Sequence, residues 1–312
     1  MLCGTTCVNT TTSTSSLVAF YKFDNNTVDT TNQYPLTWSG SVSVEYVSGW
    51  VDSAIKFQKA NQKYLYASHI PLNSRSVTIE FWFFTTELTG STDSGMAGEK
   101  ESTSTQRALQ FLLRNNKAYF GFYNEDTAGV TTIQANQWYH IAFVYDYSIT
   151  QQFIYLNGVL DESEDHPPFL GTTGDFTIGG AFYSASNTNA QYYSGYIDHF
   201  MVYQRAKSSC EIFLDATLAC YFRFDSPSNL IDSGPNILTA SQINATSTIG
   251  RVNQAFQFNN IPSYITISGI TALSTSSYTK EFTISMWINP INITDGATLI
   301  HASTQADGRF VL

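Results

Sequence analysis

The sequence is short of charge, and of basic charge above all. Only 13% of its 312 residues are charged, and 15 Lys and Arg stand against 25 Asp and Glu, a formal net charge of −10. Nucleic-acid backbones are held by clustered Lys and Arg, and the sequence has no such cluster. The composition therefore argues against a nucleic-acid partner and leaves cations or neutral molecules as ligands.

Long apolar runs are missing as well. No stretch approaches the roughly 18 apolar residues that a membrane-spanning helix needs, so we expect no membrane segment. Residues 1–4 lack the apolar core of a secretory signal, and we expect that the natural start lies upstream or that export is not encoded here. Gly-x-Gly-x-x-Gly, Walker and His-Glu-x-x-His patterns are absent too, which excludes the corresponding nucleotide and zinc-protease sites.

Cysteine is scarce, and its placement is informative. The four cysteines are Cys3, Cys7, Cys210 and Cys220, without the spacing or histidine partners of a zinc site. They allow three pairings, and all stay open, including Cys210 with Cys220 and a bridge from Cys7. Their presence favours an oxidising compartment over the cytosol.

Aromatic residues are abundant, at 15% of the chain. Many Tyr, Phe and Thr with little Lys and Glu suit sheet faces better than amphipathic helices. The composition therefore predicts an all-β protein.

One stretch occurs twice and organises the chain. Residues 17–24 read LVAFYKFD and residues 218–225 read LACYFRFD, 218 − 17 = 201 residues apart. This spacing is about the length of one large all-β domain and predicts tandem domains. Asp29 in the first copy is matched by Asp232 in the second. Residues 49–57 match residues 250–258, and residues 77–83 match residues 282–288.

The repeat sets the predicted domain boundaries. We predict a polar linker over 1–16, a complete domain over 17–214 and an incomplete second domain over 215–312. Half of a two-sheet sandwich would leave an apolar face and bare strand edges in water. We therefore expect the second domain to belong to a longer protein.

Local patterns predict the elements of the complete domain. In 77–83, Val77, Ile79, Phe81 and Phe83 alternate with Thr78, Glu80 and Trp82, the period of a strand. Further predicted strands are 108–113, 118–123, 138–145, 176–178 and 195–203. Residues 85–106 read as a long polar rim or binding loop. Asn157-Gly158 predicts a hairpin turn, and the capping-box spacing of Ser208 and Glu211 predicts a helical turn.

Several of these segments, taken in order, resemble the laminin G-like, concanavalin A-like family. The segments are FYKFD (20–24), TIEFW (78–82), WYHIA (138–142), YLNG (155–158), GYID (195–198) and YQRA (203–206). The resemblance implies an antiparallel two-sheet jelly-roll sandwich, present as one complete copy and the N-terminal half of another. It also implies carbohydrate or extracellular protein ligands, a secreted or surface location, and in many members a Ca²⁺ ion on the sheet rim. A minority of the superfamily are glycoside hydrolases.

The metal hypothesis uses Asp24 and Asp198. Where chain termini lie side by side, the Asp ending the first strand and the Asp in the last can converge on a hard cation such as Ca²⁺, which prefers oxygen ligands. In the alternative, both are edge residues that accept hydrogen bonds from backbone amides.

A glycosidase site would need two carboxylates about 5–5.5 Å apart. The acidic run 161–165 could supply such a pair from alternate residues. It follows a hairpin and precedes Pro167-Pro168, however, so we interpret it as a solvated loop. His140 and His199 are interpreted as structural residues, because no nucleophile motif accompanies them.

The predicted ligand contacts lie in the loop 183–193. Sugars are held by aromatic stacking together with amide and hydroxyl hydrogen bonds, and the candidates are Tyr183, Asn187, Asn189, Tyr192 and Tyr193. The alternative is an ordinary polar surface loop.

These observations predict a non-catalytic extracellular recognition or adhesion module for carbohydrate or protein ligands. The alternatives are a glycoside hydrolase, an accessory carbohydrate-binding domain of a glycan-active enzyme, and a structural spacer.

Overall fold

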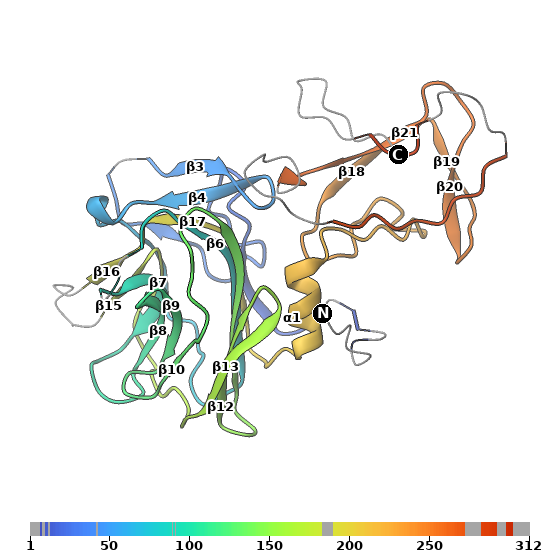
Figure 1. The fold of residues 1–312 in the computed structure, drawn as a ribbon. Coiled ribbons are helices and arrows are strands. Elements are labelled where there is room, and N and C mark those ends of the chain that lie inside the picture. The colour runs from blue at the N-terminus through green and yellow to red at the C-terminus, as the bar shows by residue number, and fades with distance from the viewer. Residues whose placement is uncertain are drawn as a thin grey trace. The chain divides into compact units, whose positions relative to one another are not determined.

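The protein is described here from a computed structural model. It describes residues 7, 10–11, 13–41, 43–88, 90, 92–182, 190–271, 282–291 and 298–301. The chain divides into a first unit, Met1–Thr217, and a second unit, Leu218–Leu312 (Figure 1). This division falls three residues after the end predicted from the repeat, at 217 instead of 214.

An eight-stranded antiparallel sheet forms one layer of the first unit. Its order is β13-β12-β11-β6-β17-β4-β3, and β1 pairs with β17. The strands are β1 (Leu17–Tyr21), β3 (Glu45–Ser48), β4 (Ser53–Phe57), β6 (Val77–Thr85), β11 (Trp138–Asp146), β12 (Gln151–Leu156), β13 (Val159–Asp165) and β17 (Gly195–Tyr203).

A seven-stranded antiparallel sheet forms the other layer, in the order β10-β9-β8-β7-β14-β5-β2. The strands are β2 (Thr37–Trp38), β5 (Leu65–Ala67), β7 (Ser94–Lys100), β8 (Ala108–Arg114), β9 (Lys117–Gly121), β10 (Asp126–Ala128) and β14 (Phe176–Ile178). A short hairpin of β15 (Gly180–Phe182) and β16 (Ala190–Tyr192) and a 3-10 helix, η2 (Lys59–Asn61), complete it. The predicted antiparallel sandwich is confirmed.

Aromatic rings fill the space between the two sheets. Phe143 on β11 meets Phe111 on β8 at 4.9 Å and Phe120 on β9 at 5.5 Å between ring centroids. Phe200 on β17 meets Phe176 on β14 at 6.0 Å. All five rings are fully buried, and each buried Phe stabilises the fold by about 1.5–3 kcal/mol.

The first and last strands of the sandwich are neighbours. In β1, Ala19 and Tyr21 enter the core, and Tyr21 pairs with Phe200 of β17. The repeated stretch therefore forms the first strand of the sandwich, and this strand pairs with the last one.

The predicted alternation in β6 is confirmed. Val77, Ile79, Phe81 and Phe83 all belong to the central core. Glu80 and Trp82 are buried on the opposite face, where other parts of the first unit cover the sheet.

The prediction of a loop over residues 85–106 is wrong for its central part. Residues 94–100 form β7, a strand between β8 and β14. Its sequence SGMAGEK has small residues because another backbone approaches: a Cβ on Gly95 would overlap Ala181 of β15 and Gln191 of β16. Because the β15–β16 hairpin packs so closely here, β7 lacks the bulky β-branched residues that usually indicate a strand.

The Asn157-Gly158 hairpin is confirmed, but the interpretation of the acidic run after it as a loop is wrong. Asn157 and Gly158 have φ angles of 51° and 80°, as a type I′ turn requires. Residues 161–165 continue as the edge strand β13. The run is charged because an edge strand faces water, and charge discourages pairing with other chains.

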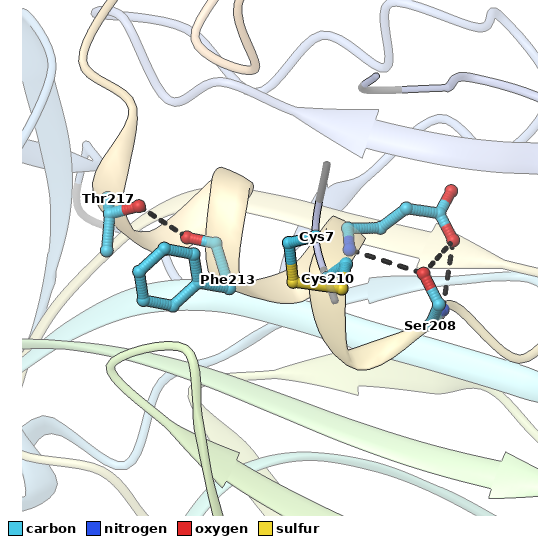
Figure 2. The surroundings of a disulfide bond; sticks show 6 residues. Cys7, Ser208, Cys210, Phe213 and Thr217 are labelled. Carbon is cyan, nitrogen blue, oxygen red and sulfur yellow. Dashed lines mark hydrogen bonds between the residues drawn. A yellow bond between two sulfur atoms is a disulfide. The ribbon is translucent and has the colours of Figure 1, made fainter. Parts of the chain in front are cut away.

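Helix α1 (Ser209–Thr217) follows the sandwich and lies beside β13 (Figure 1). The predicted capping box is present: Glu211 N–H donates to Ser208 Oγ at 3.3 Å, and Ser208 N–H donates to Glu211 Oε2 at 2.9 Å (Figure 2). Ile212 packs on Ala142 and Tyr155 of the eight-stranded sheet. The helix is therefore part of the sandwich.

A disulfide joins Cys7 to Cys210 in the first turn of α1 (Figure 2). Arg205 adds hydrogen bonds to the carbonyl oxygens of Ser13 and Ser15, at 3.2 and 2.9 Å. Cys7, Ser13 and Ser15, which lie in the predicted polar linker, are thus held to the first unit. Among the described cysteines, Cys220 is unpaired.

The second unit repeats the first strand pairs of the first unit. Its strands are β18 (Thr239–Ile243), β19 (Ala245–Ile249), β20 (Gln254–Phe258) and β21 (Tyr264–Ser268), paired as β18 with β21 and β19 with β20. Ile249 pairs with Gln254 in β19–β20, as Ser48 pairs with Ser53 in β3–β4, each residue 201 positions later.

The strand predicted over residues 282–288 is not formed. These residues are described without strand pairing, and Phe282 and Trp287 are 65% and 77% exposed. The counterpart β6 takes its hydrogen bonds from β11 and β17, and residues 282–288 have no such partners within the described residues. No helix in the described part of the chain is long and apolar enough to cross a membrane.

Candidate functional site

The outer face of the seven-stranded sheet carries a row of residues in cross-strand register. Tyr66 on β5 pairs with Thr177 on β14, which pairs with Gly98 on β7. The next partners are Gln110, Gly121 and Asp126. We call these six residues the outer row. They face outward because their strand neighbours Leu65, Phe111 and Phe120 belong to the core.

Polar atoms in the outer row lack partners. Gln110 Nε2 and Asp126 Oδ1 are buried and form no hydrogen bond. Both side chains lean over Gly121, because a Cβ there would overlap Asp126 Oδ1 and lie 3.3 Å from Gln110 Oε1. Buried polar groups are normally hydrogen-bonded, so the unpaired donor and acceptor on either side of Gly121 make this position the candidate site.

Neighbouring side chains fix the Asp126 carboxylate. Tyr119 Oη donates to Asp126 Oδ2 at 2.6 Å, and the Arg114 guanidinium lies 3.9 Å from the Tyr119 ring centroid. Arg114 in turn makes a two-point ion pair with Asp93, at 2.7 and 2.6 Å. Burial and the Asp126 carboxylate raise the pKa of Tyr119, so its hydroxyl stays a donor and Oδ1 stays free to accept.

A third unpartnered polar atom lies on the same strand face. Lys100, two residues along β7 from Gly98, has a buried Nζ without a hydrogen bond. Burial lowers its pKa. An amine, an amide and a carboxylate on one face can together donate to and accept from a ligand rich in hydroxyl groups.

Partly exposed aromatic rings gather at the Tyr66 end of the outer row. Tyr64 lies 6.0 Å from Tyr66, 4.8 Å from Phe182 on β15 and 6.4 Å from Tyr192 on β16, between ring centroids. We call these four residues the aromatic cluster. Their ring faces offer apolar surface next to the polar atoms.

The residues predicted to contact ligand have different outcomes. Tyr183, Asn187 and Asn189 lie outside the described residues. Tyr192 belongs to the aromatic cluster. Tyr193 is wrong as a surface contact, because it is fully buried in the core. Its N–H donates to Gly179 O, so the chain turns inward directly after β16 and takes the ring with it.

Asp24 and Asp198, the predicted metal pair, lie near each other. Burial and, to a smaller extent, the Asp198 carboxylate raise the pKa of Asp24. Both carboxylates raise the pKa of His199. Asp198 is fully buried; its Oδ2 accepts from Val51 N–H at 2.9 Å, and its Oδ1 lies 2.8 Å from His199 Nδ1. Burial alone would lower the pKa of His199, but the Asp198 carboxylate raises it. His199 is therefore a hydrogen-bond donor to that carboxylate.

These contacts do not fit Ca²⁺. Both oxygens of Asp198 face N–H donors, whereas a calcium site needs six to eight oxygen ligands. Asp24 Oδ1 accepts from Ser53 N–H at 3.3 Å. The described residues contain no group of three His, Cys, Asp or Glu side chains placed to hold a metal. The two carboxylates instead bond backbone amides, the alternative interpretation given above.

The second unit repeats the Asp24 contact. Asp225 Oδ1 accepts from Gln254 N–H at 3.1 Å, 29 residues further along, the spacing that separates Asp24 from Ser53. The aspartate that recurs in the two units therefore bonds the backbone of the hairpin that follows it.

Sequence patterns missed Lys100, Gln110 and Asp126. One signal was available: Gly98 and Gly121 stand inside strands, where glycine often marks a close approach by a ligand or another backbone. What could not be read was the register that sets Gln110 and Asp126 on either side of Gly121.

Comparison with known proteins agrees with this architecture. Residues 59–213 match the family model described as the concanavalin A-like lectin/glucanases superfamily. The first unit belongs to this superfamily. No curated protein matches the chain in sequence.

Solved structures resemble the chain in fold. Domain 4 of AbnA, a GH43 extracellular arabinanase from Geobacillus stearothermophilus solved with arabinotriose, has 19% identity and a TM-score of 0.52 over 64% of this chain and 97% of that chain. The binding domain of Paraclostridial Mosquitocidal Protein 1 has 14% identity and a TM-score of 0.53 over 95% and 73%. The binding domain of botulinum neurotoxin DC, solved with rat synaptotagmin II, has 11% identity and a TM-score of 0.51 over 81% and 71%. At these sequence identities, the similarity shows only that the chains share the concanavalin A-like fold.

Proposed function

We propose that the first unit is a non-catalytic module that binds carbohydrate through the outer row and the aromatic cluster. The observation that carries the proposal is the pair Gln110 Nε2 and Asp126 Oδ1, both buried and without partners beside Gly121. An oligosaccharide presents hydroxyls that both donate and accept, together with the apolar faces of its rings, and can extend across the strands that separate Gln110 from Tyr66. The outer row matches the first property, and Tyr64 and Tyr66 match the second.

Relatives in fold support this ligand class. The arabinanase domain was solved with arabinotriose. The neurotoxin binding domain was solved with a protein, synaptotagmin II. We favour a carbohydrate because single unpartnered polar atoms flanking a glycine suit a small hydroxyl-bearing group.

A binding role is favoured over hydrolysis by the count of carboxylates. Glycoside hydrolases use two, about 5–5.5 Å or 6.5–9.5 Å apart. In the described outer row Asp126 is the carboxylate present, and Tyr119 already occupies one of its oxygens. The disulfide Cys7–Cys210 supports a secreted or cell-surface location, since such bonds persist in oxidising compartments.

Glycan-array binding followed by isothermal titration tests the proposal. Asp126→Asn removes the charged acceptor while keeping the shape, and we expect the affinity to fall about 10- to 100-fold, because a hydrogen bond to a charged group contributes about 1.5–3 kcal/mol. Gln110→Ala should weaken binding of the same glycan. Arabinotriose is the first probe.

Glu45→Gln is the matched control, since it removes an exposed carboxylate on the other sheet and should leave binding unchanged. Unchanged melting temperatures would show that the variants fold. Equal affinity of wild-type and Asp126→Asn protein would contradict the proposed site, and release of reducing sugar would contradict the non-catalytic role. Added Ca²⁺ or chelator should not change the affinity.

A further inference from the structure

Three ionisable side chains meet under helix α1, away from the outer row. Lys207 Nζ donates to Glu80 Oε1 at 2.6 Å and also contacts Asp215 Oδ2. The three side chains are 1%, 0% and 4% exposed in that order. We call them the charge cluster.

The surrounding residues exclude water from the charge cluster and hold its side chains in position. Lys207 Nζ lies 4.5 Å from the centroid of the Tyr203 ring, and Lys207 N–H donates to Thr78 Oγ1 at 3.0 Å. His140, fully buried, has its Nε2 3.9 Å from Glu80 Oε2. Burial lowers the pKa of His140 to about 4, so it is neutral beside the cluster.

The cluster is costly as a set of charges. Taking a charge from water into a protein interior costs several kcal/mol per ion, which the attraction between the partners must offset. One cation faces two carboxyl groups, and Glu80 Oε2 is buried without a partner. The ion-pair contacts of Lys207 thus leave Glu80 Oε2 without a hydrogen bond.

We propose that Lys207 and Asp215 become joined by an amide bond, with Glu80 as the proton acceptor. The amine is in contact with the carboxyl group that it would attack, and Glu80 is in contact with the same amine. Water is excluded from all three groups, so no solvent shell stands between the amine and the carboxyl group that it would attack.

The protonation state of Asp215 favours this reaction, whereas Lys207 must first lose a proton. Burial, together with the Glu80 charge, raises the pKa of Asp215 to about 6, which increases its protonated fraction. Burial favours the neutral amine of Lys207, but the Glu80 and Asp215 carboxylates outweigh it and hold its pKa above the usual value. The amine is therefore freed by passing a proton to Glu80.

The atoms and charges balance without any other reactant. The Lys207 ammonium gives one proton to the Glu80 carboxylate, and the Nζ lone pair attacks Cγ of protonated Asp215. The N–C bond forms, a second Nζ proton passes by way of Glu80 to the departing hydroxyl, and the Cγ–OH bond breaks to release water. The charges of Lys207 and Glu80 are both lost, and the products are a neutral amide, a protonated Glu80 and one water molecule.

Intact mass spectrometry of the reduced full chain tests this. The expected mass is lower than the sequence mass by one water molecule, and tandem spectra of protease digests should show one branched peptide that joins Lys207 to Asp215. The exposed pair Lys56–Glu45, at 2.7 Å, is an internal control, and its peptides should be recovered unlinked. A full sequence mass, or a water loss that maps elsewhere, would overturn the proposal.

Two variants separate the chemistry from folding. Glu80→Gln keeps the side-chain shape and removes the proton acceptor, so the folded variant should lose the branched peptide. Lys207→Arg keeps the charge and should lose it as well. A folded Glu80→Gln protein that still contains the amide would remove Glu80 from the reaction.

Discussion

The two units begin with the same local structure and end with different degrees of burial. Tyr21 and Phe23 stack at 6.1 Å and 18° in the first unit, and Phe222 and Phe224 stack at 6.2 Å and 19° in the second. The first pair is fully buried, whereas the second pair is only partly buried.

Strands added later in the first unit account for this difference. Tyr21 and Phe23 are covered by a core that includes Phe81 on β6 and Phe200 on β17. Within the described residues the second unit has two strand pairs but no counterpart of the paired β6, β11 and β17. The repeated segment therefore specifies turns and hairpin register by itself, while burial depends on strands far away in the sequence.

The largest expected effect concerns independent folding. Residues 1–217 expressed alone should unfold in one cooperative transition, because both sheets and the core between them lie in this unit. Residues 218–312 expressed alone should show no cooperative transition, since two-stranded ribbons are marginal in water. Scanning calorimetry measures both, and a sharp transition in the second fragment would contradict the comparison.

Removing the disulfide should destabilise the first unit selectively. The bond joins residues 203 positions apart, and a loop of this size gives about 5 kcal/mol of stabilisation in the chain-entropy model. Urea unfolding of a Cys7→Ser, Cys210→Ser variant measures the loss. Cys220→Ser is the control, because Cys220 is unpaired and its removal should leave the first transition unchanged.

Asp29, which is matched by Asp232 in the second unit, offers a test with a smaller expected effect. It accepts N–H bonds from Phe20, Thr31 and Tyr34, and Asp29→Ala would leave buried donors unsatisfied, at a cost of about 3 kcal/mol. Burial would raise the pKa of Asp29, but the bonds to Phe20, Tyr34 and Thr31 outweigh it and lower the pKa.

The pH dependence follows from that shift. Because the pKa is lower in the folded state, Asp29 stabilises the first unit above its unfolded pKa of about 3.9. The contribution is lost as the pH falls through the lower folded value, so Asp29→Asn should flatten acid unfolding below about pH 4. Urea midpoints of the fluorescence transition at several pH values measure this, with Asp232→Asn in the second unit as the comparison.

The smallest effect concerns solvent exposure of Trp287. Its side chain is 77% exposed, against 5% for Trp82 at the equivalent position in β6, which stacks on Trp50 at 3.7 Å. Trp287→Phe should lower acrylamide quenching of the total fluorescence, and Trp82→Phe should not. Equal effects would mean that residues 282–288 are covered after all.

Sequence patterns predicted the elements that are stabilised locally. The Asn157-Gly158 turn, the alternation in β6 and the capping box at Ser208 depend on neighbouring residues, and all are confirmed. β7 was missed because the packing of β15 and β16 requires small residues there. Residues 282–288 carry a strand pattern, but hydrogen-bond partners decide whether it becomes a strand.

The candidate site was less accessible to sequence reasoning than the fold. Loop composition drew attention to Tyr192 and Tyr193, yet one residue separates a surface ring from a buried one. The outer row depends on the register of strands β7 to β10, which a single sequence does not display. Strand-interior glycines were the available clue.

The Cys7–Cys210 bond has a mechanical consequence. It joins a residue before the sandwich to one in the helix that follows it, so a pull along the chain passes from Cys7 directly to α1. The strands between carry none of that load. Reduction would put them in the line of force and release the 203-residue span between the cysteines, a slack of roughly 700 Å when fully extended. In an oxidising environment the first unit would act as an inextensible link, and the proposed binding site would keep its shape under tension.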